Sequence, residues 1–140
     1  MVHALREICR VLIERGIVID LRPLTGSWPV EVVSRGRRHA AGYVTGVAEG
    51  IADDTAANEA MAKAAGEGLL RRERHELFDF CYYWNSPGEM QEYIDEEWAD
   101  FVKVDADTAT AVRRLWAVAE ADARVSVRLT MLITRWIKLG

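Results

Sequence analysis

The stretch ALREICRVLIERGIVIDLRP, residues 4–23, joins a helix pattern to a strand pattern. Its first apolar residues follow the i, i+3, i+4, i+7 spacing of an amphipathic helix, at Leu5, Ile8, Cys9 and Leu12. Gly16 can adopt the left-handed conformation that ends a helix. Residues 17–21, Ile-Val-Ile-Asp-Leu, are mostly β-branched and almost continuously apolar. They predict a strand that is buried on both faces, as in a parallel sheet.

The next part of the chain predicts a hairpin followed by a helix. Residues 30–34 and 39–46 read as two short strands around Arg35-Gly36-Arg37. Asp53 or Asp54 can cap a helix over residues 55–65, whose packing side is mostly alanine.

An aromatic alternation at Phe78, Phe80, Tyr82 and Trp84 is the clearest strand signal of the chain. Residues 69–76 either extend this strand or form a separate edge strand. Ser86-Pro87-Gly88-Glu89 has the form of a capping box with proline at the first helical position. A helix over residues 107–121 and a long alternating strand up to residue 138 follow. The order predicts an α/β domain, a small mixed sheet with helices packed on it.

Composition narrows the function classes. The chain has 140 residues and a net charge of −4, so one domain is expected and nucleic-acid binding is not. No apolar run reaches membrane-spanning length. Cys9 and Cys81 lack CxxC spacing and are expected to be free thiols of a cytoplasmic protein. The three histidines are scattered, so no metal site is expected.

Three segments resemble the second half of the class I S-adenosylmethionine-dependent methyltransferases. The opening helix matches the family form L-x-E-x-x-R-V-L at Leu5, Glu7, Arg10, Val11 and Leu12. A single glycine, Gly16, stands where the family has a Pro-Gly-Gly loop before its fifth strand. FCYYWNSPGEMQEYIDEEW, residues 80–98, is similar to the sixth strand and the segment behind it. RLTMLITRWIK, residues 128–138, is similar to the closing strand, so the resemblance implies a Rossmann-like fold.

The family binds its cofactor through a glycine-rich turn after the first strand and an acid after the second. The glycines of residues 42–46 fall in the predicted hairpin, and those of residues 66–68 at a helix end. Residues 1–140 are therefore expected to form a single methyltransferase-like half-domain that lacks the cofactor-binding half. Alone it should bind no cofactor. Methyl transfer, if it occurs, would need a partner that supplies S-adenosylmethionine with the missing half.

The resemblance also implies a substrate site, because the parallel fifth and sixth strands end at the same edge of the sheet. The expected substrate-binding residues at this edge are Asp20, Arg22, Trp28, Tyr83, Trp84 and Asn85. An aromatic wall with an arginine suits an anionic or planar small molecule. Structural roles compete with this interpretation: Trp84 as a core residue, and Asp20 as the ion-pair partner of Arg22. No catalytic residue is identified.

Without the first four strands, residues 17–21 would be an uncovered apolar edge. Either the hairpin folds over this edge or another chain does. That chain would be a second copy, giving a homodimer, or a separate cofactor-binding chain. Two further functions stay open: a stand-alone small-molecule binding module that uses the strand-end rim, and a purely structural interaction domain.

Overall fold

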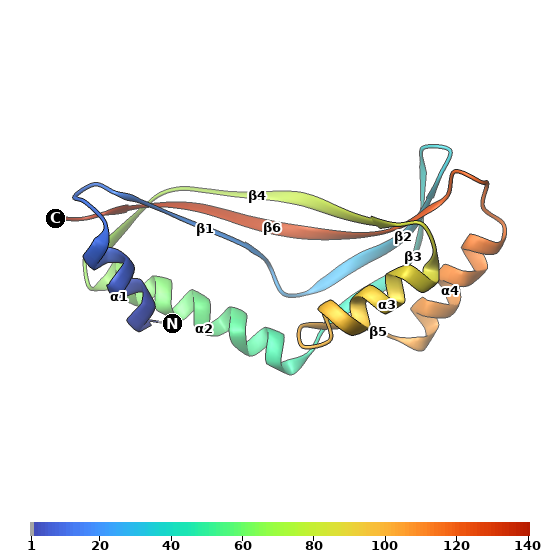
Figure 1. Cartoon of the computed structure of the whole chain (residues 1–140), viewed down its shortest axis with the longest axis horizontal. Helices are drawn as coiled ribbons and strands as arrows, with labels where there is room; N and C mark the ends of the chain where they lie inside the picture. Colours follow the sequence, from blue (N-terminus) through green and yellow to red (C-terminus); the bar gives the residue numbers. More distant parts are fainter. Residues whose placement is uncertain (1) are drawn as a thin grey trace. The chain divides into compact units, whose positions relative to one another are not determined.

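The computed structural model describes residues 2–140 as an α/β protein (Figure 1). The helices are α1 (Val2–Val11), α2 (Ala48–Gly66), α3 (Pro87–Glu97) and α4 (Ala106–Ala117). The strands are β1 (Ile17–Pro23), β2 (Ser27–Ser34), β3 (Arg37–Gly46), β4 (Leu70–Trp84), β5 (Val102–Val104) and β6 (Arg124–Lys138). The chain divides into two compact units, which we call the first unit (residues 2–24, 52–78 and 131–140) and the second unit (residues 25–51 and 79–130).

The sheet is antiparallel, where the sequence predicted a mixed one. Its strands follow the order β1-β6-β2-β3-β5, and β4 also pairs with β6. β1 and β4 run in the same direction, as the predicted parallel strands should. They are not neighbours, however, because each pairs with the oppositely directed β6. The α/β class is confirmed, but the described sheet is antiparallel and therefore not the mixed sheet that the sequence predicted.

In the first unit, α1 and α2 supply the core that packs against the sheet. The buried cluster consists of Leu5, Cys9, Ala60, Met61, Ala64, Leu70 and Trp136. Val18 of β1 packs against this cluster. The small side chains of Ala60 and Ala64 let α2 lie close to its neighbours, which confirms the predicted alanine packing side.

The helix α2 begins earlier than the sequence predicted. It starts at Ala48, so Asp53 and Asp54 lie inside it and neither is its cap. The preceding residues already form a helical turn, because the Ile51 N–H donates to the Val47 carbonyl at 3.1 Å. The preference of aspartate for capping positions is overridden by this turn.

In the second unit, β2 and β3 form the predicted hairpin, with Arg35 (φ 50°) and Gly36 (φ 70°) at its turn. The register shifts between Val30 and Glu31, opposite Gly42. Gly42 has φ +154°, and a Cβ built there would lie 2.3 Å from Thr108 Oγ1. Glycine at this position therefore lets α4 approach β3 closely.

The predicted start of α3 is confirmed. Ser86 caps the helix, because the Glu89 N–H donates to Ser86 Oγ at 3.1 Å, and Pro87 occupies the first turn. The Glu89 side chain accepts from the Asn85 N–H at 2.9 Å, one residue before the position that a standard capping box uses. Met90 and Ile94 are buried.

Two long strands contribute to both units. β4 is a single strand of 15 residues, which settles the open question over residues 69–76. Along β6, Val125, Val127 and Leu129 are buried in the second unit, where Ser126 of the other face is buried as well. In the first unit the buried residues are Leu132, Thr134 and Trp136. The long strand is confirmed, but one alternation does not run along its whole length, because the buried apolar residues change from odd to even positions after Leu129. In residues 2–140, no helix combines the length and apolar character that crossing a membrane requires.

Candidate functional site

One face of β1 is uncovered, contrary to the expectation of burial on both faces. Ile17, Ile19 and Leu21 are 46%, 53% and 54% exposed. The residues between them are half-buried. The reason is that only the face of β1 that carries Val18 packs on the core of the first unit.

The uncovered face extends from β1 onto β6. Directly opposed residues of an antiparallel pair share a face, and Ile17, Leu21 and Pro23 lie opposite Ile137, Ile133 and Met131. We call this surface the β1 face; its members are Ile17, Ile19, Leu21, Met131, Ile133 and Ile137. Arg135 lies opposite Ile19 on the same face and pairs with Glu73 at 3.0 Å, so a charged pair interrupts the apolar residues. Exposed apolar residues gathered on one face often mark an interaction site.

The backbone of β1 adds hydrogen-bonding groups at the same place. Lys138 N–H donates to the Gly16 carbonyl at 2.9 Å, which sets the phase of the β1–β6 ladder. Because bonded pairs alternate in an antiparallel ladder, the N–H and C=O groups of Ile17, Ile19 and Leu21 point away from β6. In the described chain no strand pairs with this outer edge. The predicted hairpin does not cover this edge, because its first strand, β2, pairs with β6.

Asp20 and Arg22 form the predicted ion pair on the other face of β1. Arg22 Nε lies 3.2 Å from Asp20 Oδ1, without the geometry of a hydrogen bond. The guanidinium also contacts Asp54 Oδ1 at 3.0 Å and donates to Asn58 Oδ1 at 2.7 Å. All three charged side chains are about 16% exposed. The charge of Arg22 is therefore used within the fold, as the structural interpretation predicted.

Trp28 and Trp84, two other predicted binding residues, are buried in an aromatic cluster of the second unit. Trp98 joins them, with ring centroids 5.7 Å from Trp28 and 5.9 Å from Trp84. Tyr82 and Tyr93 complete the cluster at 4.8 Å and 5.3 Å from Trp98. Burial raises the pKa of Tyr93. The two predicted tryptophans are core residues in this arrangement.

Tyr83 and Asn85 have separate roles in the second unit. Tyr83 OH accepts from Arg38 Nη2 at 2.7 Å, and the backbone of Asn85 takes part in the α3 cap. Among the six predicted residues, Asp20 and Arg22 form an ion pair, and Trp28 and Trp84 belong to the same aromatic cluster. As a substrate-binding set the six stay a prediction.

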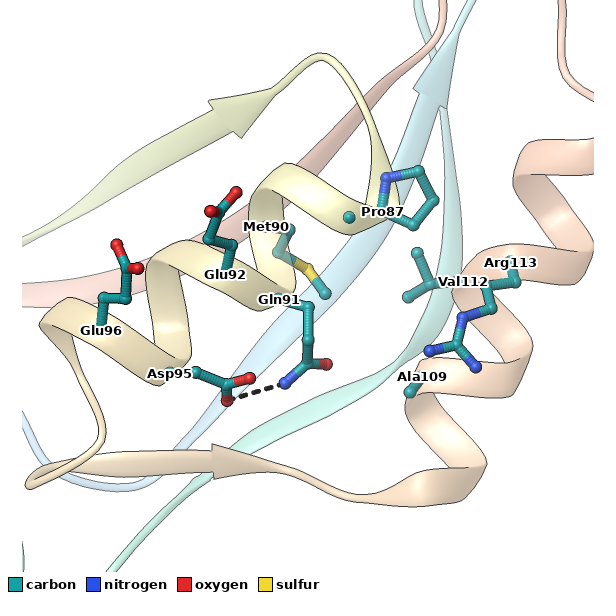
Figure 2. Close-up of a pocket in the computed structure, with 10 residues that line it drawn as sticks. Pro87, Met90, Gln91, Glu92, Asp95, Glu96, Ala109, Val112 and Arg113 are labelled. Atoms are coloured by element: carbon teal, nitrogen blue, oxygen red, sulfur yellow. Dashed lines mark hydrogen bonds between the residues drawn. The ribbon is translucent and has the colours of Figure 1, made fainter.

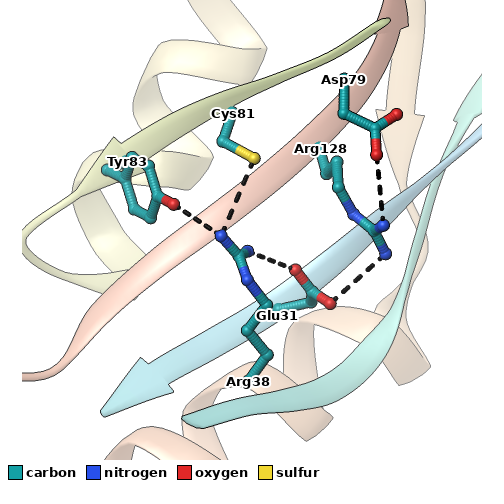
Figure 3. A network of polar contacts seen from close by, with 6 residues as sticks. All are labelled: Glu31, Arg38, Asp79, Cys81, Tyr83 and Arg128. Atoms are coloured by element: carbon teal, nitrogen blue, oxygen red, sulfur yellow. Dashed lines mark hydrogen bonds and ion pairs between the residues drawn. The ribbon is translucent and has the colours of Figure 1, made fainter. Parts of the chain in front are cut away.

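A polar network surrounds the buried Glu31 of β2 (Figure 3). Glu31 Oε2 accepts from Arg38 Nη1 at 2.7 Å, and Oε1 lies 3.5 Å from Arg128 Nη2. Arg128 also lies 3.5 Å from Asp79. Glu31 and Tyr83 raise the pKa of Arg38. Two arginines thus balance two carboxylates, which indicates a structural network. The sequence did not predict it, because Arg38 looks like part of a basic hairpin tip.

A cleft of about 460 Å³ lies between α3 and α4 (Figure 2). Met90 and Val112 are its buried apolar residues. Glu92, Asp95 and Glu96 give its rim an acidic character, and Gln91 donates to Asp95 at 2.9 Å. Carboxylates on an exposed helix face are ordinary solvated charges.

Gly46 lies between a strand and a helix, since β3 ends at Gly46 and α2 begins at Ala48. The sequence had placed this glycine in the hairpin alone. The turn is filled by the backbone of Phe101. Val47 N–H donates to the Phe101 carbonyl at 2.9 Å. A Cβ built on Gly50 would lie 2.8 Å from the same oxygen. Gly50 therefore permits close packing of α2 on the chain at Phe101.

No protein-family model, curated protein or solved structure matches the chain. Within residues 2–140, no three His, Cys, Asp or Glu side chains gather as ligands of a metal ion. The outer edge of β1 and the β1 face are the part of the described surface whose geometry best suits an interaction with another chain.

Proposed function

We propose that residues 1–140 act as the second half of a class I methyltransferase-like fold, completed by a chain that pairs along β1. The isolated half has no cofactor site of its own in this proposal. The completing chain is a separate cofactor-binding half, and a second copy of this chain holds the same edge when that half is absent.

The strand directions support the proposal. β1 and β4 correspond to the fifth and sixth strands of the family resemblance and run in the same direction. β6 corresponds to the closing strand and runs antiparallel to β1. The stretch from α1 to β1 also keeps the helix-to-strand order on which the resemblance rests.

The observation that carries the proposal is the unpaired outer edge of β1. Ile17, Ile19 and Leu21 are about half exposed, and their backbone groups point away from β6. An apolar edge strand with free N–H and C=O groups is a template for pairing with another strand. A neighbouring strand would satisfy the backbone, and a helix following that strand would cover the β1 face.

The oligomeric state of the purified chain tests this proposal. We expect a dimer by light scattering at micromolar concentration. Ile19→Pro should give a monomer, because proline removes an N–H that points to the outer edge and leaves the β1–β6 ladder intact. Ile19→Thr is the matched control: it keeps the N–H and β-branching and should remain dimeric. A monomeric parent, or a dimeric Ile19→Pro with an unchanged circular dichroism spectrum, would contradict pairing along β1.

Calorimetric titration with S-adenosylmethionine tests the missing cofactor half separately. The isolated chain should give no binding heat. Saturable binding by the isolated chain would overturn the assignment of these residues to the cofactor-free half, whatever the oligomeric state.

A further inference from the structure

The second unit contains a cleft between the β2–β3 hairpin and the end of α4. Its volume is about 410 Å³, within the usual range of small-molecule sites. None of the six predicted substrate-binding residues lines it, and it shares no residue with the cleft between α3 and α4. Residues of the second unit alone form it, so it does not depend on the proposed pairing along β1.

Hydrogen bonds hold the chain after α4 against the hairpin and so shape this cleft. Ser34 Oγ donates to Asp122 Oδ1 at 3.0 Å and accepts from the Glu120 N–H at 3.3 Å. The Arg35 N–H donates to Asp122 Oδ2 at 2.9 Å, and the Arg35 side chain pairs with Glu120 at 2.9 Å. The hydroxyl of Ser34 is therefore used within the fold, and the charges of Arg35 and Glu120 offset each other.

Arg37 and His39 of β3 are the lining residues whose polar groups remain available. They lie opposite Ser34 and Val32 in the β2–β3 ladder, so they share the face of the hairpin that carries those two buried residues. Both are exposed, and within residues 2–140 neither forms an ion pair. Since Arg35 is paired, Arg37 leaves the lining of the cleft with an uncompensated positive charge, which favours an anion.

The α4 side of the cleft is apolar. Leu115, Val118 and Ala119 line it where the helix ends, and Val118 is 82% exposed. The C-terminal end of a helix carries partial negative charge, which disfavours an anionic group on this side. A ligand would therefore direct its anionic group toward Arg37 and its apolar part toward Val118.

We infer that the second unit binds a small carboxylate with an apolar body in this cleft. The carboxylate pairs with the Arg37 guanidinium, whose planar N–H groups match its two oxygens. It also accepts a hydrogen bond from His39, because either tautomer of a neutral imidazole carries one N–H. The apolar body covers Leu115 and Val118 and removes their apolar surface from water. One uncompensated positive charge matches a singly charged carboxylate better than a doubly charged phosphate.

Hydrocinnamate is the probe for this site, and calorimetry on the full chain is the first readout. It should bind saturably at millimolar concentration or below, and the neutral hydrocinnamyl alcohol should bind about tenfold more weakly. Arg37→Gln should weaken hydrocinnamate binding about tenfold and leave the affinity for the alcohol unchanged. Arg71→Gln is the matched control: it removes an exposed arginine that lies outside the cleft and forms no ion pair in the described chain, so it should bind like the parent.

The methyl groups of Val118 report where hydrocinnamate binds. In a ¹H–¹³C spectrum, the methyl peaks that are missing in Val118→Ser should shift on titration of the parent. Val118→Ser should bind the acid and the alcohol about threefold more weakly, because both lose apolar contact. Absence of saturable binding, unshifted Val118 methyl peaks, an alcohol that binds as tightly as the acid, or equal affinity in Arg37→Gln with an unchanged melting temperature would overturn the inference.

Discussion

Replacing Arg22 with methionine should destabilise the first unit strongly. Arg22 contacts Asp20 at 3.2 Å and Asp54 at 3.0 Å, and all three side chains are about 16% exposed. Methionine keeps much of the side-chain length but removes the cation that Asp20 of β1 and Asp54 of α2 share. Breaking a buried pair costs about 3–5 kcal/mol, and the partial exposure here favours the lower end, about 3 kcal/mol. The hydrogen bond to Asn58 is lost as well.

Urea unfolding followed by circular dichroism measures this loss. Arg22→Met should lower the free energy of unfolding by about 3 kcal/mol. Asp20→Asn combined with Arg22→Met should recover part of it, because one unpaired charge is removed. Arg128→Met is the control. Its side chain is 38% exposed and 3.5 Å from its partners, so its loss should cost below about 1 kcal/mol. Equal losses in the two single variants would refute the reasoning.

Two other predictions concern the second unit. Gly42→Ala should destabilise the chain by about 1–3 kcal/mol, because the new Cβ would meet Thr108. Thermal unfolding measures this loss. A variant as stable as the parent would contradict the close approach of α4 to β3. Asp105 and Asp122 have lowered pKa values, because the Thr108 and Arg35 backbone N–H groups respectively donate to them. The stability that they contribute is present above their ordinary pKa of 3.8 and lost as the pH falls through the lowered values. In the double variant Asp105→Asn/Asp122→Asn, the free energy of unfolding should fall less steeply as the pH is lowered. An unchanged pH dependence would contradict the hydrogen bonds from Thr108 N–H and Arg35 N–H.

The sequence predicted those elements of the fold whose signals are local. The strand at residues 78–84, the Ser86 cap and the turn at Gly36 each depend on neighbouring residues, and each is confirmed. The start of α2 was missed because Asp53 and Asp54 have strong capping preferences. The turn that overrides them is visible only in the backbone hydrogen bonds around Val47.

The exposure of β1 could not be predicted from its composition. Ile17, Ile19 and Leu21 are the residues of a buried strand, and only the missing cover on one face makes them exposed. Within the candidate sites, the Asp20–Arg22 pair was predictable from its i, i+2 spacing in a strand. Its partners Asp54 and Asn58 lie more than 30 residues away, so only the fold brings them to Arg22.

The change of buried face along β6 restricts how this strand can vary in length. Val125, Val127 and Leu129 serve one core, while Leu132, Thr134 and Trp136 serve the other. Inserting or deleting one residue within either run would turn the side chains beyond it to the opposite face, whereas a change of two residues would preserve the alternation. Natural variants of this protein should therefore keep the spacing from Val125 to Trp136, or change it in steps of two.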